Sequence, residues 1–190
     1  MASTVDKDSA NWRLFGGGGL LVGGLLWLIS VVVGLAVPGT IVATWLAIVG
    51  LLIVGIALFL VAFGETGSNG AVGASVFGKA VLVIFGLGWV LFGLVLLLAV
   101  VGTAAPAVIT TIAGVLVVVG GILSAYAIWQ RGVARGAARW IIVVPVVLGI
   151  LFVISALGWV AISGWWLPLL LAVAFVVTGL LYLLNRKDIG

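Results

Sequence analysis

Three arginines form the clearest chemical pattern in the chain. Arg131, Arg135 and Arg139 are spaced by four residues in a polar segment between two apolar runs. If this segment is helical, the three guanidinium groups share one face of the helix. A basic face beside a membrane attracts anionic lipid headgroups, and each charge contributes about 1 kcal/mol. The three arginines are therefore candidate anionic-lipid contacts, with a simple anchor of membrane topology as the alternative.

The residue types used in catalysis and metal binding are scarce. The 190-residue sequence has no Cys and no His, and its single Met is Met1. Thiolates, imidazoles and thioethers hold most zinc, copper, iron–sulfur and haem groups, so we predict no metal site and no cofactor. Acid–base and nucleophilic catalysis need a carboxylate, His or Cys beside the reacting atom, and the apolar runs contain none of these. The sequence therefore indicates a protein that is not an enzyme.

Glycine is the other prominent residue, with 29 copies in the chain. Small residues such as those of a G-x-x-x-G spacing let helices approach closely in lipid, where apolar burial between helices adds little. The candidate helix-packing positions are Gly19, Gly23, Gly55, Gly121 and Gly179. These glycines either dock a partner protein or a second copy of the chain, or pack the helices of one chain together.

Hydroxyl-bearing residues occur within the apolar runs. Eight of them are Ser30, Thr44, Thr110, Thr111, Ser124, Tyr126, Ser155 and Thr178. Ser and Thr in a helix satisfy their hydroxyls on the carbonyl four residues back or on a neighbouring helix. We expect this structural role here, because the eight residues fall at different depths and do not converge on one site.

The elements that position these residues follow from composition. Hydrophobic residues make up 66% of the chain and charged residues 6%, whereas soluble domains carry roughly 25% charged residues. A spanning helix needs about 20 mostly apolar residues, and in lipid such a run must be helical to satisfy its backbone. The predicted spans are 15–37, 41–63, 80–101, 105–129, 140–162 and 165–184. The fold class is therefore an all-α integral membrane protein with six transmembrane helices.

The connections between spans alternate in character. The turns at 38–40, 102–104 and 163–164 are short and uncharged, whereas the loops at 64–79 and 130–139 are longer and polar. Short turns place consecutive helices antiparallel and adjacent, so the six helices form three hairpins. We predict one six-helix domain over residues 14–184, with tails at 1–13 and 185–190.

The distribution of basic residues predicts the orientation. With six spans, all eight basic residues fall on one side of the membrane. They are Lys7, Arg13, Lys79, Arg131, Arg135, Arg139, Arg186 and Lys187. The positive-inside rule makes this side cytoplasmic. We therefore expect a multi-pass protein of the cell (inner) membrane, with the N-terminus and C-terminus both cytoplasmic and the first helix retained as an anchor.

The hairpins resemble copies of one another. The segments 14–16 and 76–78 share a Phe-Gly pair, and Trp27 and Trp89 are also separated by 62 residues. A fixed period of this kind is the signature of an internal repeat, here of about 62 residues. Each copy has an apolar Gly-rich helix, a proline near the outer turn and a second helix with a central glycine. This pattern resembles the HdeD family of small six-helix bacterial membrane proteins, and the resemblance implies an envelope or stress-associated role.

Three functional hypotheses remain open at this point. The first is a non-catalytic, HdeD-like membrane protein, and the second is an accessory subunit packed against a larger respiratory or transport assembly. The third is a channel or facilitator for a small uncharged solute. The expected partners are the lipid bilayer, with anionic headgroups on the cytoplasmic side, and either a homo-oligomer or a larger membrane complex. No nucleic-acid partner is expected, because the chain has no soluble basic domain.

Cysteine labelling tests the predicted topology, since the chain has no native Cys. Thr40→Cys and Ser163→Cys should react with a membrane-impermeant thiol reagent added to intact cells. Ser68→Cys should react only after lysis, because it lies in a loop on the basic side. The opposite pattern would reverse the orientation, and mixed labelling would show that the number of spans is wrong.

Overall fold

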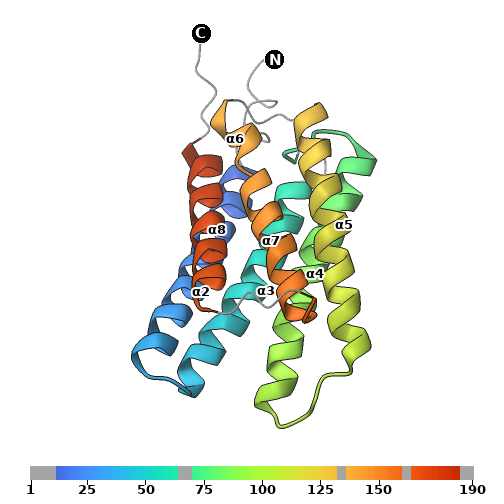
Figure 1. The fold of residues 1–190 in the computed structure, drawn as a ribbon. Coiled ribbons are helices and arrows are strands. Elements are labelled where there is room, and N and C mark those ends of the chain that lie inside the picture. The colour runs from blue at the N-terminus through green and yellow to red at the C-terminus, as the bar shows by residue number, and fades with distance from the viewer. Residues whose placement is uncertain (1–11, 64–69, 132–135, 160–163, 185–190) are drawn as a thin grey trace.

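A computed structural model describes residues 12–63, 70–131, 136–159 and 164–184, which are mainly helical (Figure 1). The described residues contain six helices long and apolar enough to cross a membrane, which confirms the predicted six-span, all-α fold. The first span begins with a π-helical segment, and the fifth is divided in two. The elements are η1 (Trp12–Gly17), α2 (Gly18–Ala36), α3 (Ile41–Phe63), α4 (Val76–Val100), α5 (Ala107–Arg131), α6 (Ala137–Trp140), α7 (Val143–Ala156) and α8 (Trp166–Leu184).

The six spans form a closed ring. Each span packs against the next one along the chain, and α8 packs against α2 to complete the circle. The turns after α2 and α4 lie at one end of the bundle, while η1, α6 and the last turn of α8 lie at the other (Figure 1). The described basic residues Arg13, Lys79 and Arg139 belong to η1, the start of α4 and α6, so they gather at this second end. This arrangement matches three antiparallel hairpins.

The fifth span differs from the prediction. It was expected to run over 140–162, but α7 ends at Ala156 and the chain turns at Gly158, whose φ is +73°. Pro145 explains the division at the other end, because proline has no N–H to donate to Ile141 four residues back. The carbonyl of Ile141 instead accepts from Val144 N at 3.0 Å, in a tighter turn that separates α6 from α7.

The first span also begins earlier than predicted. Trp12 and Arg13 are helical, although the sequence placed residues 1–13 in the tail. Trp12 is buried and packs edge-on against Tyr182 of α8, with ring centroids 5.6 Å apart. The start of the first span is therefore held by the end of the last one. The tails at 1–11 and 185–190 lie outside the described residues.

Helix α2 contacts a neighbour closely on each of two faces. A Cβ placed on Gly23 would lie 2.9 Å from the carbonyl oxygen of Gly50 in α3. A Cβ placed on Gly24 would lie 2.8 Å from the backbone nitrogen of Val176 in α8. Real Cβ atoms essentially never come this close to another atom. Glycine is therefore required at both positions for the backbones of α3 and α8 to approach α2.

The predicted packing glycines all lie at contacts between helices of this chain. A Cβ on Gly19 would lie 2.7 Å from the Cβ of Ala57 in α3, and a Cβ on Gly55 would lie 2.7 Å from the carbonyl oxygen of Gly86 in α4. Gly121 of α5 faces Phe85 of α4 and Val146 of α7, and Gly179 of α8 faces Gly17 and Leu21. Of the two alternatives left open by the sequence, the structure places these glycines in packing within one chain.

Three of the described hydroxyl groups donate a hydrogen bond to a backbone carbonyl. Thr111 and Thr178 each donate to the carbonyl four residues back, at 3.0 and 2.7 Å. Ser30 of α2 donates across the helix contact to the carbonyl oxygen of Ala43 in α3, at 2.7 Å. The hydroxyl oxygens of Ser124 and Tyr182 are buried and have no hydrogen-bond partner among the described residues. The three donors follow the structural role expected for them.

Replacing Gly19 and Gly23 together with leucine should destabilise the protein without changing its oligomeric size. The two new side chains would push α3 away from α2, and overpacking of this kind costs about 1–3 kcal/mol per site. We expect the midpoint of thermal unfolding, followed by circular dichroism in detergent, to fall by about 5 °C or more.

Gly18→Leu is the matched control, since a Cβ at Gly18 meets nothing within 4 Å. It should leave the midpoint unchanged or raise it, because leucine favours helix more than glycine does. A smaller species of the double variant in native electrophoresis, with an unchanged midpoint, would show that this glycine face binds another molecule.

Candidate functional site

Metal-binding and carboxylate chemistry have no centre in the described structure. Among the described residues there is no group of three or more His, Cys, Asp or Glu that could hold a metal ion. The four acidic residues of the chain, Asp6, Asp8, Glu65 and Asp188, all lie outside the described residues. The side chains left to form a site are aromatic, apolar, hydroxyl-bearing or basic.

Aromatic rings fill the middle of the bundle. Trp89 of α4 is fully buried, and its ring centroid lies 5.4 Å from that of Phe175 in α8 and 5.7 Å from that of Trp27 in α2. Phe152 of α7 lies 6.1 Å from Trp89 and 6.0 Å from Trp27. We call this set the central aromatic cluster; it consists of Trp27, Phe85, Trp89, Phe92, Phe152 and Phe175. Centroid separations of this size are those of rings in direct contact.

The cluster closes the interior of the ring of helices. It draws side chains from α2, α4, α7 and α8, so the rings meet across the bundle instead of lining an opening. The Nε1–H of Trp89 is buried and has no hydrogen-bond acceptor among the described residues. A solute path through this part of the bundle would have to displace several packed aromatic side chains.

One spacing in the sequence marks three members of this cluster. Trp27 and Trp89, which are 62 residues apart in the sequence, contact each other in the structure. Phe152 lies 63 residues after Trp89 and takes the corresponding place in the first helix of the third hairpin. A glycine precedes each of the three aromatic residues by three positions, at Gly24, Gly86 and Gly149. This G-x-x-aromatic spacing includes Phe152, whereas the Phe-Gly pair, the tryptophan period, the proline and the central glycine of the repeat do not.

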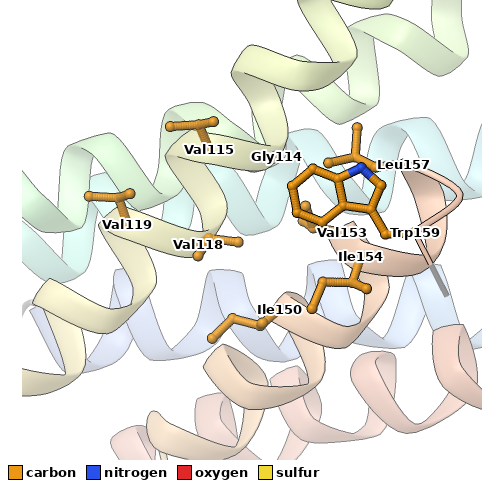
Figure 2. A pocket seen from close by; sticks show the side chains of 9 residues that line it. All are labelled: Gly114, Val115, Val118, Val119, Ile150, Val153, Ile154, Leu157 and Trp159. Atoms are coloured by element: carbon orange, nitrogen blue, oxygen red, sulfur yellow. The ribbon is translucent and has the colours of Figure 1, made fainter.

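An apolar groove runs between α5 and α7 (Figure 2). These helices are neighbours in the ring, but they pack less closely than α4 packs against α5. The groove has a volume of about 230 Å³, and its walls present no polar surface. It is lined by Gly114, Val115, Val118 and Val119 of α5, by Ile150, Val153, Ile154 and Leu157 of α7, and by Trp159. We call it the α5–α7 groove.

A second cavity adjoins the α5–α7 groove at the start of α5. Its volume is about 460 Å³, and it shares Leu157 and Trp159 with the groove. Thr110 and Thr111, in the first turns of α5, give this second cavity a polar lining. We call it the threonine mouth, because it joins the apolar groove to the end of the bundle where α5 begins.

No protein-family model, curated protein or solved structure matches this chain. The functional inferences below therefore rest on the residues of this chain alone.

The predicted arginine face is divided in the structure. Arg131 is the last residue of α5, whereas Arg139 belongs to α6, and the chain between them turns at Gly136 with φ at +59°. Because the segment is not one continuous helix, Arg131 and Arg139 do not share a helical face as the spacing suggested. The side chain of Arg131 and the whole of Arg135 lie outside the described residues.

Arg139 instead folds back onto the end of α5. Its Nε donates to the carbonyl oxygen of Trp129 at 3.0 Å, and its Nη2 donates to the same oxygen. The last carbonyls of a helix lack partners within the helix and carry partial negative charge, so a guanidinium is favourable there. The contact leaves the other N–H groups of the guanidinium available to a ligand.

Three exposed aromatic side chains lie close together where α5 ends and α6 leads into α7. The Trp129 ring lies 6.3 Å from the rings of Tyr126 and Trp140, and all three side chains are exposed. Tyr and Trp rings favour the headgroup level of a membrane. The other described basic residues also lie against rings, with Lys79 Nζ 5.8 Å from the Phe63 centroid. The geometry here suits contact with lipid headgroups at the membrane surface.

Arg139→Gln should lower stability more than Arg131→Gln does. Both changes remove one positive charge, but Arg139 also satisfies a carbonyl at the end of α5, and hydrogen bonds to charged groups contribute about 1.5–3 kcal/mol when protected from water. Arg139 is partly exposed, so we expect a loss of about 1 kcal/mol, measured by thermal unfolding in a zwitterionic detergent. Equal losses in the two variants would show that net charge, and not the contact with Trp129, is what matters.

Proposed function

We propose that this chain is a non-catalytic protein of a bacterial inner membrane, with an HdeD-like supporting role in envelope or stress physiology. The observation that carries the proposal is the filled interior of the bundle, where Trp89 contacts rings from three other helices. The described part of the spans has no metal centre and no carboxylate, so we assign the function to the surface of the bundle. The specific role comes from the resemblance of the hairpin pattern to the HdeD family.

We also propose that both ends of the chain are cytoplasmic. The described basic residues Arg13, Lys79 and Arg139 lie at one end of the bundle. The first span begins and the last span ends at this same end (Figure 1). The positive-inside rule supports the cytoplasmic assignment of this end. On this orientation, the exposed rings of Trp129 and Trp140 meet the inner leaflet.

The two alternative functions receive less support from the geometry. A facilitator needs a path for its solute, and the central aromatic cluster obstructs the interior of the bundle. An accessory subunit needs a docking face, and the glycines that were candidates for docking contact α2, α3, α4 and α7 of the same chain. Both alternatives remain outcomes of the experiment below.

Deletion of the gene in its native host should reduce survival under acid challenge, and the parent chain should restore it. Trp89→Ala should restore survival poorly, because truncating a buried aromatic side chain costs about 3–5 kcal/mol of stability. Trp45→Ala is the matched control, since Trp45 is exposed and its loss leaves no buried cavity. Membrane levels of each variant, measured by immunoblot, separate loss of protein from loss of function.

Two further measurements on purified protein identify the alternatives. Vesicles containing the parent chain should swell no faster than empty vesicles when small uncharged solutes are added, and faster swelling would favour the facilitator. Purification in mild detergent should yield this chain alone, and a stoichiometric partner protein would favour the accessory subunit. An unchanged survival of the deletion strain would overturn the envelope role.

A further inference from the structure

The α5–α7 groove opens directly onto the surface that faces lipid. Val115 and Val119 on its α5 wall are 53% and 47% exposed, so the groove is not sealed off from the surroundings of the bundle. Both of its walls belong to spanning helices. The groove is therefore continuous with the apolar surface that contacts the bilayer, and whatever occupies it enters from the hydrocarbon phase.

The lining excludes water as the occupant. A bound water needs two to four polar partners, and the walls of the groove present no polar surface. An empty groove is also unfavourable, because the side chains that line it would lose dispersion contacts on one side. Hydrocarbon is the one material in the bilayer that satisfies both conditions.

The shape of the groove identifies the kind of hydrocarbon. From Ile150 to Leu157 the α7 wall extends about 10 Å at 1.5 Å per residue. A volume of about 230 Å³ along that length corresponds to a mean cross-section of roughly 20 Å². A helix with its side chains is about 10–12 Å across and needs several times that area. The groove therefore has room for a single extended hydrocarbon chain, whereas the backbone of a helix would not fit inside it.

The threonine mouth offers polar contacts to one end of the occupant. Thr110 and Thr111 place hydroxyl groups at the membrane edge, where the glycerol and ester groups of a phospholipid lie. No charged residue occurs between Lys79 and Arg131 or between Arg139 and Arg186, so the mouth offers no ionic contact to a phosphate. Trp159 lies at the junction of mouth and groove, which is the interfacial depth that indole favours.

We propose that the α5–α7 groove binds one acyl chain of a phospholipid from the leaflet in which α5 begins. The ester region of that lipid lies at the threonine mouth, and its chain follows the groove past Gly114 toward Val119 (Figure 2). The site is distinct from the basic end of the bundle, where headgroups of the opposite leaflet meet Arg139. The proposal does not depend on the envelope role.

Photo-cross-linking in vesicles tests this site. The parent chain is reconstituted in phosphatidylethanolamine and phosphatidylglycerol with a trace of phospholipid that carries a diazirine in the middle of one acyl chain. Mass spectrometry of peptides should find adducts concentrated on residues 114–119 and 150–157. Val118→Phe and Ile154→Phe each add a ring inside the groove, and each should reduce these adducts about fivefold or more.

Ile112→Phe is the matched control, since Ile112 is an exposed residue of α5 that lines neither cavity. It should leave the adducts unchanged. Even labelling of all lipid-facing helices, or unchanged labelling in both filled variants, would overturn the site. Protection of the groove peptides in a dimer seen by native electrophoresis would also overturn it, because the occupant would then be a second copy. Circular dichroism shows whether each variant is folded, and two filled variants on different helices guard against the failure of one.

Discussion

Close contact between helix backbones at glycine is the interaction on which this bundle depends. In lipid, two apolar helices gain little by leaving hydrocarbon for each other, so association relies on van der Waals contact at short range. Helix α2 makes such contact on both sides, through Gly23 with α3 and through Gly24 with α8. The same principle joins α3 to α4 at Gly55 and Gly86, and it fixes the spacing of the ring on that side. Helix α7 has fewer of these contacts, and the α5–α7 groove lies along one of its edges.

Small residues and large residues occupy different places in the bundle. Glycines lie where neighbouring helices touch, whereas indole and phenyl rings occupy the space that a ring of helices encloses. Trp89 and Phe175 meet edge to face, with ring planes at 89°. An aromatic face is a weak acceptor for an N–H group, which suits an indole with no other acceptor nearby. The aromatic rings therefore fill the interior of the bundle, while the glycines allow neighbouring helices to pack closely around it.

The sequence predicted the spans well because lipid leaves a long apolar run only one backbone conformation. It predicted the boundaries of the fifth span poorly, because apolar content does not reveal that Pro145 divides the helix or that Gly158 ends it early. The partners of Gly19 and Gly23 could not be predicted, since glycine spacing is the same for contact within a chain and between chains. The prediction of a shared arginine face was wrong for a related reason. A spacing of four residues gives one face only in a continuous helix, and the chain turns at Gly136. The α5–α7 groove depends on how tightly two helices pack, and no residue pattern records that.

The contact between α2 and α8 also bears on how the protein is made. The first and last spans are adjacent in the finished ring, yet almost the whole chain separates them. During synthesis the side of the first span that faces α8, with Gly17 of η1 and Gly24 of α2, stays exposed to lipid until α8 has been made and inserted. Long-range contacts of this kind form late and slowly. The two hairpins made first are therefore able to associate early through α3 and α4, whereas the contact between α2 and α8 forms only after α8 has been synthesised and inserted.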